Sequence, residues 1–492
     1  MRVGFNGLAQ LAPLVVAFAL TPLLLSRLGL DRFGIWSLAL VILATLTALD
    51  GGVSASLARF FAVYAARADR ADTGRLLLGS FLFFLLLGVG LTLAVLPIAP
   101  AIAGLLDVPE RLNGEAVVVL RWLPPLTALA LMAASTSALL QGNGQFRALA
   151  AAMWASSGTF AVAVIVLVQP GAHLRALMVA TGVRYVVLVG ASLLFAARNV
   201  SIRRPLLPSR ATMREFRSYA SWMQLTALTG FVTVQMDAFV IAAVLPIRYV
   251  GLYSIGMQAA TAARSLPLYA FAPLLTRLAT TFRSGGREAT AAEFERLERR
   301  WLPAVLAYGT VAVAAIGFSV PVWLGDGYVL SGVVATILLA GYVVHVGLTG
   351  VRTCYARAVG RPGLETRYAL VWTVGNAVLT IPLALVAGVV GVVTATAITA
   401  LIASVYFVVL CRRTEQLPMI VPGRRWWRFA AVAVGVTITG EIAIVQTSLH
   451  GFFALALTGL PALAGLAIFA AGLRQASALV MPRDFERPAG RL

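Results

Sequence analysis

The sequence predicts an all-α polytopic membrane protein with about fourteen transmembrane helices. Of its 492 residues, 60% are hydrophobic and 12% are charged, and the mean hydropathy is +0.90. Soluble domains carry roughly 25% charged residues, so a soluble fold is excluded. Apolar runs of about 18 residues or more, long enough to cross a hydrocarbon core of about 30 Å, recur from one end of the chain to the other. Almost no chain is left for a second, soluble domain.

The apolar runs define the expected helices in order. In the first half we expect helices over residues 8–27, 33–64, 76–99, 116–140, 147–168 and 175–197. In the second half we expect them over 217–244, 248–281, 301–324, 330–356, 366–388, 390–411, 428–446 and 452–473. The first run lacks a small-residue cleavage pattern, so we expect it to be retained rather than removed as a signal peptide.

The charge distribution tests this helix order. Formal net charge is +20, and all 39 basic residues are arginines. With the N-terminus in the cytoplasm, the expected cytoplasmic segments hold 28 of the 39 arginines, whereas the opposite loops hold five. This is the asymmetry that orients membrane proteins, so both termini are expected on the cytoplasmic side. Because the arginines lie in short loops between apolar runs, the basic balance does not indicate a nucleic-acid partner.

Two parts of the sequence resemble each other after a shift of 217 residues. The aligned pairs are Leu28 with Leu245, Gly34–Leu38 with Gly251–Ile255 and, after one residue of slip, Leu57–Arg59 with Leu275–Arg277. Chance similarity between apolar segments is the alternative explanation. Because six helices return the chain to its starting side, a true repeat implies two parallel six-helix units. We therefore expect one lobe over residues 1–200, a second over 201–415, and two appended helices with a cytoplasmic tail over 416–492.

Several short motifs resemble bacterial polysaccharide flippases of the multidrug/oligosaccharidyl-lipid/polysaccharide (MOP) exporter superfamily. They are Arg27–Gly29, Gly34–Trp36, Leu49–Gly52, Leu57–Arg59, Leu140–Gly142, Gly144–Arg147, Gln235–Asp237, Val250–Ser254 and Pro273–Leu275. The resemblance covers most of residues 8–411. It implies a V-shaped, two-lobed helical fold that moves undecaprenyl-diphosphate-linked oligosaccharide or polysaccharide units from the inner to the outer leaflet of the bacterial plasma membrane by alternating access. It also implies a polysaccharide polymerase and glycosyltransferases as partners.

Two related transport functions remain open. The flippase for the lipid-linked peptidoglycan precursor shares the fourteen-helix count and a cationic cavity. A cation-coupled multidrug antiporter of the same superfamily usually has twelve spans and a less cationic cavity. The two additional helices and the arginines inside apolar runs argue against the antiporter.

Arginines within the apolar runs are the candidate ligands for an anionic head group. The planar guanidinium binds phosphate oxygens in pairs and stays charged when it is partly desolvated. Arg264 and Arg184 are expected in mid-helix, where they need either a cavity or an acidic partner. Arg59 and Arg277 occupy equivalent repeat positions near cytoplasmic helix ends, where interfacial anchoring or capture of the diphosphate would explain them.

Two carboxylates inside apolar runs are candidates both for lining the substrate cavity and for ion coupling. Asp50 precedes Gly51 and Gly52, which can break a helix, and Asp237 lies in the seventh expected helix. Either could exchange H⁺ or Na⁺, or simply pair with an arginine. Glu441 lies in the thirteenth expected helix, where local pairing is the simpler explanation.

The sequence does not predict an enzyme. Without lysine it cannot contain a phosphate-binding GxxxxGK[ST] loop. Its two cysteines and three histidines do not form a metal-binding pattern, and no large loop is present to hold catalytic carboxylates. We therefore expect neither a cofactor nor a bound metal.

Overall fold

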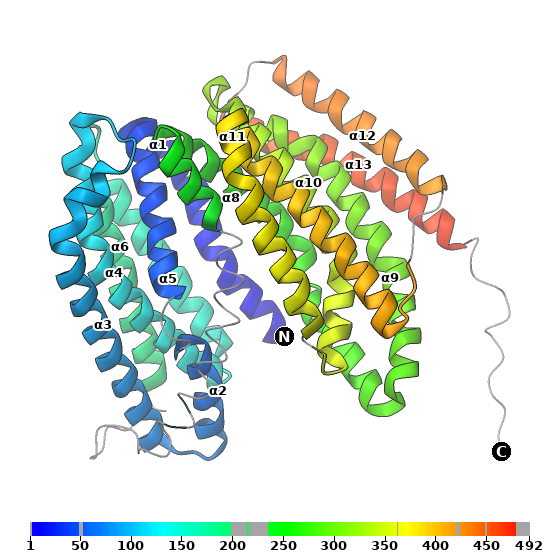
Figure 1. Ribbon diagram of the computed structural model, residues 1–492, viewed down its shortest axis with the longest axis horizontal. Helices are drawn as coiled ribbons and strands as arrows, with labels where there is room; N and C mark the ends of the chain where they lie inside the picture. The colour runs from blue at the N-terminus through cyan, green and yellow to red at the C-terminus, as the bar shows by residue number, and fades with distance from the viewer. Residues whose placement is uncertain are drawn as a thin grey trace. The chain divides into compact units, whose positions relative to one another are not determined.

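The described parts of the chain fold into long α-helices (Figure 1). The computed structural model describes residues 2–48, 53–197, 214, 216, 235–361, 363–419, 424–447 and 450–478. Its contacts divide the chain into two compact units. Unit 1 comprises Met1–Ser254 with Thr380–Val392, and unit 2 comprises Ile255–Leu379 with Val393–Leu492.

Unit 1 holds the first helices of the chain. They are α1 (Arg2–Ala48), α2 (Val53–Ala66), α3 (Arg70–Gly104), α4 (Glu110–Gly142), α5 (Phe146–Leu167), α6 (Arg175–Ala196), the helical segment Gln235–Val244 and the start of α8 (Arg248–Leu268). Within this unit α3 packs on α4, α5 packs on α6, and α1 packs on α5.

Unit 2 holds the rest of α8 and the later helices. These are α9 (Phe271–Leu324), the short 3₁₀ helix η2 (Asp326–Tyr328), α10 (Val329–Ala358), most of α11 (Gly363–Glu415), α12 (Arg424–Val445) and α13 (Phe452–Ala478). α9 packs along α10, and the antiparallel pair of α12 and α13 packs against α9.

Three of the longest helices contain a break in the backbone. Non-helical torsions occur at Gly29 in α1, at Gly286 in α9, and at Ala387 and Gly388 in α11. The three glycines have positive φ, which costs glycine little. A straight helix of 53 residues, the length of α11, would extend ~80 Å at about 1.5 Å per residue, far more than one bilayer crossing needs. α11 is therefore long enough for the two helices expected over 366–388 and 390–411.

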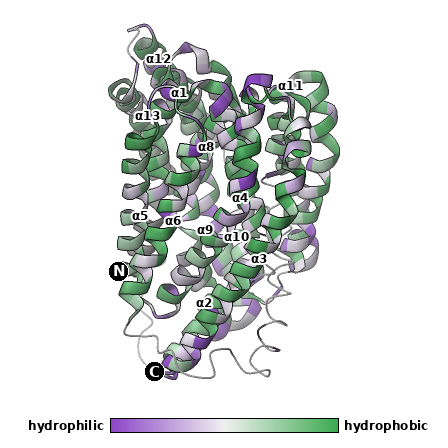
Figure 2. Cartoon of the chain, turned by 90° about the vertical axis from the view of Figure 1, so that its left-hand side faces the viewer, coloured by the Kyte–Doolittle hydropathy of each residue, from purple (hydrophilic) through white to green (hydrophobic). Residues whose placement is uncertain are grey.

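The prediction of a polytopic membrane protein is confirmed. Among the described residues, nine helices are long and apolar enough to cross a bilayer, and three shorter apolar helices accompany them. Figure 2 shows hydrophobic residues along most of the helix lengths, with hydrophilic residues mainly toward helix ends. Because the run Arg248–Leu324, which contains both α8 and α9, counts once, nine is a minimum for the described part of the chain.

Several helix boundaries differ from the expected ones. The second expected helix, 33–64, is divided between the end of α1 and all of α2. The expected helix 248–281 is divided between α8 and the start of α9, because the chain turns at Tyr269 and Ala270. Most of the expected helix 217–244 and the lobe boundary at residue 200 lie outside the described residues.

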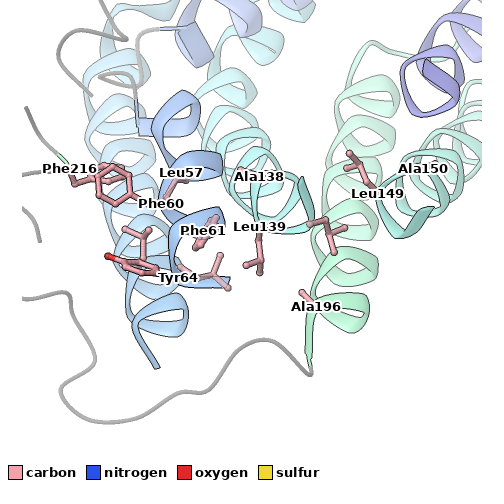
Figure 3. Close-up of a cluster of buried hydrophobic side chains, with 13 residues drawn as sticks. Leu57, Phe60, Phe61, Tyr64, Ala138, Leu139, Leu149, Ala150, Ala196 and Phe216 are labelled. Atoms are coloured by element: carbon pink, nitrogen blue, oxygen red, sulfur yellow. The ribbon is translucent and has the colours of Figure 1, made fainter. Parts of the chain in front are cut away.

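A cluster of buried side chains forms the core at one end of unit 1 (Figure 3). It joins α2 through α6, and the Phe60 and Phe216 rings lie 5.1 Å apart. Its members are Leu57, Phe60, Phe61, Tyr64, Leu76, Leu77, Ala138, Leu139, Leu140, Leu149, Ala150, Ala196 and Phe216. Gly142 ends α4 beside this core, where a Cβ would lie 2.7 Å from the Cβ of Phe61. The family motif around Gly142 therefore marks a close helix contact.

The pseudo-equivalent glycines of the expected repeat lie against one another. A Cβ on Gly251 of α8 would lie 3.3 Å from the backbone nitrogen of Gly34 in α1. A Cβ on Gly34 would collide with the carbonyl oxygen of Ile247. Small residues at such a crossing let two membrane helices approach closely. The two similar sequences thus pack directly on each other within unit 1.

Arg27 and Arg32 tie α1 to its neighbours in unit 1. The Arg27 guanidinium donates hydrogen bonds to the carbonyl oxygens of Ile165 and Val168, 2.8 and 2.7 Å away, at the end of α5. Arg32 forms a 2.7 Å ion pair with Glu115 of α4. The Glu115 carboxylate also accepts a 3.0 Å hydrogen bond from the backbone N–H of Leu174. Both arginines therefore stabilise the helix arrangement.

Candidate functional site

Of the arginines predicted to bind an anionic head group, Arg264 lies in unit 2 beside an aromatic ring. It lies in α8, and its guanidinium carbon is 4.4 Å from the centre of the Tyr342 ring in α10. Its Nε is buried and has no hydrogen-bond partner among the described residues. No carboxylate among the described residues forms an ion pair with Arg264. The structure therefore gives no support to the alternative that Arg264 pairs with a buried aspartate.

Further ring side chains lie near this arginine in unit 2. His345 of α10 lies with its ring centre 4.5 Å from that of Trp372 and 5.7 Å from that of Tyr368, both in α11. Arg264 is close enough to interact electrostatically with His345 and Tyr368. We call Arg264, Tyr342, His345, Tyr368 and Trp372 the unit 2 cluster.

Hydrogen bonds hold parts of the unit 2 cluster in place. The His345 Nδ1 lies 3.1 Å from the Ser404 hydroxyl, which itself donates to the Ala400 carbonyl oxygen. The Trp372 Nε1 is buried and has no hydrogen-bond partner among the described residues. A cation and an indole N–H are therefore both available in the cluster, and both are groups that donate to oxygen.

The unit 2 cluster has the chemistry to bind an anionic, hydroxyl-rich molecule. The Tyr342 ring stabilises the guanidinium through a cation–π interaction. The N–H groups of a guanidinium can pair with phosphate oxygens. The Trp372 N–H can donate to a hydroxyl group, while the ring faces supply apolar contact area.

Arg184 has a comparable but simpler environment in unit 1. It lies in α6, with its guanidinium carbon 5.7 Å from the centre of the Phe160 ring in α5 and 5.9 Å from that of Tyr185. Its Nε is also buried without a hydrogen-bond partner in the described residues. Within the described residues, its recorded ring contacts are those with Phe160 and Tyr185.

Arg277 and Arg59 lie in different settings despite their equivalent positions in the expected repeat. Arg277 is exposed and forms a 2.5 Å ion pair with Glu293, which also pairs with Arg296 at 3.3 Å. Arg59 is exposed at the edge of the unit 1 core, with its guanidinium 5.4 Å from the centre of the adjacent Phe60 ring. The ion pair of Arg277 favours a structural role for that residue.

Of the two carboxylate candidates, Asp237 lies among the described residues and Asp50 does not. Asp237 is buried in the segment Gln235–Val244, and its Oδ2 accepts a 3.4 Å hydrogen bond from the Tyr253 hydroxyl. Tyr253 belongs to the repeated motif after Gly251, so Asp237 is tied to that motif within unit 1. Asp50 lies outside the described residues.

The sequence indicated Arg264 but not the side chains around it. His345, Tyr342, Tyr368 and Trp372 come from two later helices, and their spacing along the chain does not predict that they meet. A histidine within an apolar run, His345, is the one signal in the sequence that points to this cluster. Within the described residues, no group of three His, Cys, Asp or Glu side chains could hold a metal ion.

The comparison with protein families gives one match. The model of a family described as "Polysaccharide biosynthesis protein" matches residues 24–286, more than half of the 492-residue chain. No curated protein matches the sequence. The matched region contains most of the motifs that suggested this resemblance, from Arg27–Gly29 to Pro273–Leu275.

Solved structures with the same fold are transporters. An inward-facing multidrug resistance MATE family transporter of the MOP superfamily matches with a TM-score of 0.69 and 16% identity, over 84% of this chain and 94% of its own. The lipid II flippase MurJ in an inward closed conformation matches with a TM-score of 0.68 and 12% identity, over 96% and 99%. A MOP superfamily transporter from Pyrococcus furiosus matches with a TM-score of 0.54 and 16% identity, over 84% and 93%. At these identities the similarity establishes the fold.

Proposed function

The chain belongs to the polysaccharide biosynthesis protein family, and we propose that it is a flippase for lipid-linked glycans. It moves undecaprenyl-diphosphate-linked oligosaccharide or polysaccharide repeat units from the inner to the outer leaflet of the bacterial plasma membrane by alternating access. A flippase makes and breaks no covalent bonds. It needs groups that replace the hydration of the head group while the prenyl tail stays in the bilayer.

The observation that carries this proposal is the environment of Arg264. A guanidinium in a membrane helix is costly unless it has a partner or a polar cavity. Arg264 lies on an aromatic ring, has a buried Nε without a hydrogen-bond partner, and forms no ion pair among the described residues. A diphosphate would supply the missing counter-charge and acceptor oxygens. The unit 2 cluster then binds the head group, with Trp372 donating to a sugar hydroxyl.

The architecture in this proposal is fourteen transmembrane helices in two parallel six-helix repeats with two C-terminal helices. The proposed lobes are residues 1–200 and 201–415, followed by the appended part at 416–492. The contact between Gly34 and Gly251 supports the repeat, because equivalent sequences pack against each other. The match to the MurJ structure covers 96% of this chain, whereas the match to the MATE structure covers 84%. The additional part of the chain that MurJ matches is about as long as two membrane helices.

The wider assignment follows from the same resemblance. Both termini are cytoplasmic, and glycosyltransferases and a polysaccharide polymerase act before and after the flippase. Transport is coupled to H⁺ or Na⁺ through Asp237 or Asp50. The burial of Asp237 and its hydrogen bond to Tyr253 support the first of these, because a carboxylate in a helix contact can respond to repacking of that contact.

Two alternatives are each favoured by one comparison. The MurJ structure is that of a lipid II flippase, so a lipid-linked peptidoglycan precursor is the first alternative substrate. The MATE structure has the highest TM-score of the three, which favours a cation-coupled multidrug antiporter. The glycan proposal rests on the family match.

The decisive experiment is a leaflet assay with the purified protein in liposomes. We expect wild-type protein to move a fluorescent undecaprenyl-diphosphate oligosaccharide between leaflets, and Arg264→Ala to slow that movement at least tenfold, because the diphosphate loses its charged donor. Arg264→Lys retains charge without the planar fork and should fall between the two.

Matched variants and substrates separate the alternatives. Arg299→Ala removes an exposed arginine and should leave the rate unchanged. Movement of a lipid-linked peptidoglycan precursor, with none of the oligosaccharide lipid, would replace the proposed substrate with the precursor. Export of a cationic drug with no lipid movement would favour the antiporter. Equal rates for wild type and Arg264→Ala would remove Arg264 from the site.

A further inference from the structure

Glu441 is a fully buried carboxylate that no described residue neutralises. It has 0% of its surface exposed, and both carboxylate oxygens are buried without a hydrogen-bond partner in the described part of the chain. Four other residues of α12 are buried at helical spacing along the same face: Trp426, Ala430, Ala433 and Thr437. Glu441 therefore continues the apolar face of α12 that packs against α9 and α13 (Figure 1).

The packing around Glu441 is close. A Cβ on Gly440 would lie 2.6 Å from the Pro461 ring of α13, and a Cβ on Gly465 would lie 3.1 Å from the carbonyl oxygen of Ala433. Because α12 and α13 are antiparallel, these contacts set a register that brings the level of Glu441 near Thr458. This tight packing leaves the carboxylate facing α9 and α13.

The hydroxyl groups at this level already donate elsewhere. Thr458 donates to the Leu455 carbonyl oxygen at 2.7 Å, and Ser319 of α9 donates to that of Ala315 at 3.0 Å. Thr437, one turn before Glu441, donates to the Ala433 carbonyl oxygen at 2.8 Å. These hydroxyls can still accept a hydrogen bond, but they do not supply the donors that an ionised carboxylate requires.

Charged groups on the same helices are too far along the chain to serve as partners. The arginines of α12 are Arg424, Arg425 and Arg428, and the nearest is thirteen residues, or ~20 Å, from Glu441. In the facing parts of α9 and α13, residues 301–324 and 452–473, Tyr308 is the only titratable residue, and its hydroxyl donates to the Ala263 carbonyl oxygen. Asp326 and His450, beyond the ends of these helices, are both exposed.

We propose that Glu441 is a proton-binding site, and that the side chain carries a proton while α9, α12 and α13 enclose it. An ionised carboxylate without donors or water is far more costly in such surroundings than the neutral acid. Glu441 lies one turn from the end of α12 at Val445, so a local opening of the helix pair would let the proton exchange with water.

This site is separate from the ion-coupling candidates Asp50 and Asp237 and does not depend on which molecule the protein transports. The test uses the full chain in lipid bilayers and compares infrared spectra of the wild type and Glu441→Gln at neutral pH. We expect the wild type to show a carbonyl band of a protonated carboxylic acid that is absent from the variant. We also expect both proteins to unfold at the same temperature, because the amide has the shape of the neutral acid.

Glu365→Gln is the matched control. Glu365 accepts hydrogen bonds of 2.8 and 2.5 Å from Arg357, so this substitution should remove a carboxylate band and leave the carboxylic acid bands unchanged. Loss of a carboxylate band in Glu441→Gln would overturn the proposal. If the carboxylate band that Glu441→Gln loses also shifts in the wild type when Na⁺ replaces choline as the buffer cation, Glu441 binds a metal cation instead of a proton. A large decrease in unfolding temperature, or a variant that does not fold, would equally contradict a neutral Glu441.

Discussion

Arg352 and Glu298 form a buried ion pair that joins three segments of unit 2. The exposed fractions of the two side chains are 2% and 0%, and the Arg352 guanidinium donates to Glu298 Oε1. The same guanidinium donates to the carbonyl oxygens of Leu348 at 2.8 Å and Pro418 at 3.2 Å. Arg352 thus connects α10 to α9 and to the segment that follows α11. It is an arginine at depth with a counter-ion, in contrast to Arg264.

Removing one member of this pair should destabilise the protein strongly. We expect Glu298→Gln or Arg352→Met to lower the free energy of unfolding by about 4 kcal/mol, because each leaves a buried charge or buried acceptors unpaired. The double variant Glu298→Leu with Arg352→Met should recover most of that loss. Thermal unfolding in detergent measures all three variants.

An exposed pair on the same helix provides the control for this measurement. Arg299 and Glu295 pair at 2.5 Å with exposed fractions of 63% and 40%. Glu295→Gln should change the free energy of unfolding by less than about 1 kcal/mol. If Glu298→Gln and Glu295→Gln have equal small effects, the buried pair does not hold the three segments together.

At the scale of the elements, glycines decide where helices break and where they cross. Positive φ at Gly29 and Gly388 lets α1 and α11 turn within one run of helix. Gly144 and Gly360 follow the ends of α4 and α10, where the next residues, Gln145 and Arg361, donate to the carbonyl oxygens of Leu140 and Ala356. Gly34 has a different role, because its missing side chain allows α1 to meet the backbone before α8.

Gly34→Ala should therefore be strongly destabilising. The added methyl group would collide with the Ile247 carbonyl oxygen, and overpacking of this kind costs about 1–3 kcal/mol or more. Thermal unfolding and yield of folded protein measure the effect. Gly90→Ala in α3 is the control, since nothing lies within 4 Å of its added Cβ, and it should be neutral or slightly stabilising. Equal unfolding temperatures for both variants would show that the crossing tolerates a side chain.

At the scale of the whole molecule, the arginine distribution sets the expected orientation in the membrane. If the N-terminus is cytoplasmic, the turn between α2 and α3 faces the cytoplasm and the connection between α5 and α6 faces outward. The native cysteines, Cys354 and Cys411, are free and buried, so they should contribute little background to labelling.

Single added cysteines test this orientation. In intact cells, a membrane-impermeant maleimide should label Gln169→Cys and should not label Arg67→Cys, both of which are exposed positions. Permeabilised cells should show labelling of both. The reverse pattern would invert the topology, and labelling of both positions in intact cells would mean that a helix has been assigned wrongly.

The site was predictable from the sequence only in part. Arg264 was identified because a charged residue within an apolar run is unusual enough to be noticed without a structure. Its surroundings were not, because Tyr342, Tyr368 and Trp372 are aromatic residues in membrane helices, where they are common. Glu441 was expected to have a local partner, yet its acceptors lack one within the described residues. Such contacts depend on how each helix is rotated about its own axis, and the hydropathy of the sequence does not show that rotation.

The sequence by itself determined the membrane character of this protein, its helical fold and its family. The reason is that the hydrocarbon core imposes length and apolar composition on every crossing, and these properties can be read along one chain. Only the tertiary structure decided that Arg277 has a counter-ion while Arg264 lies on Tyr342, and that Gly34 meets Gly251. Those outcomes depend on which helix faces pack together. That choice is made by close contacts between residues far apart in the sequence.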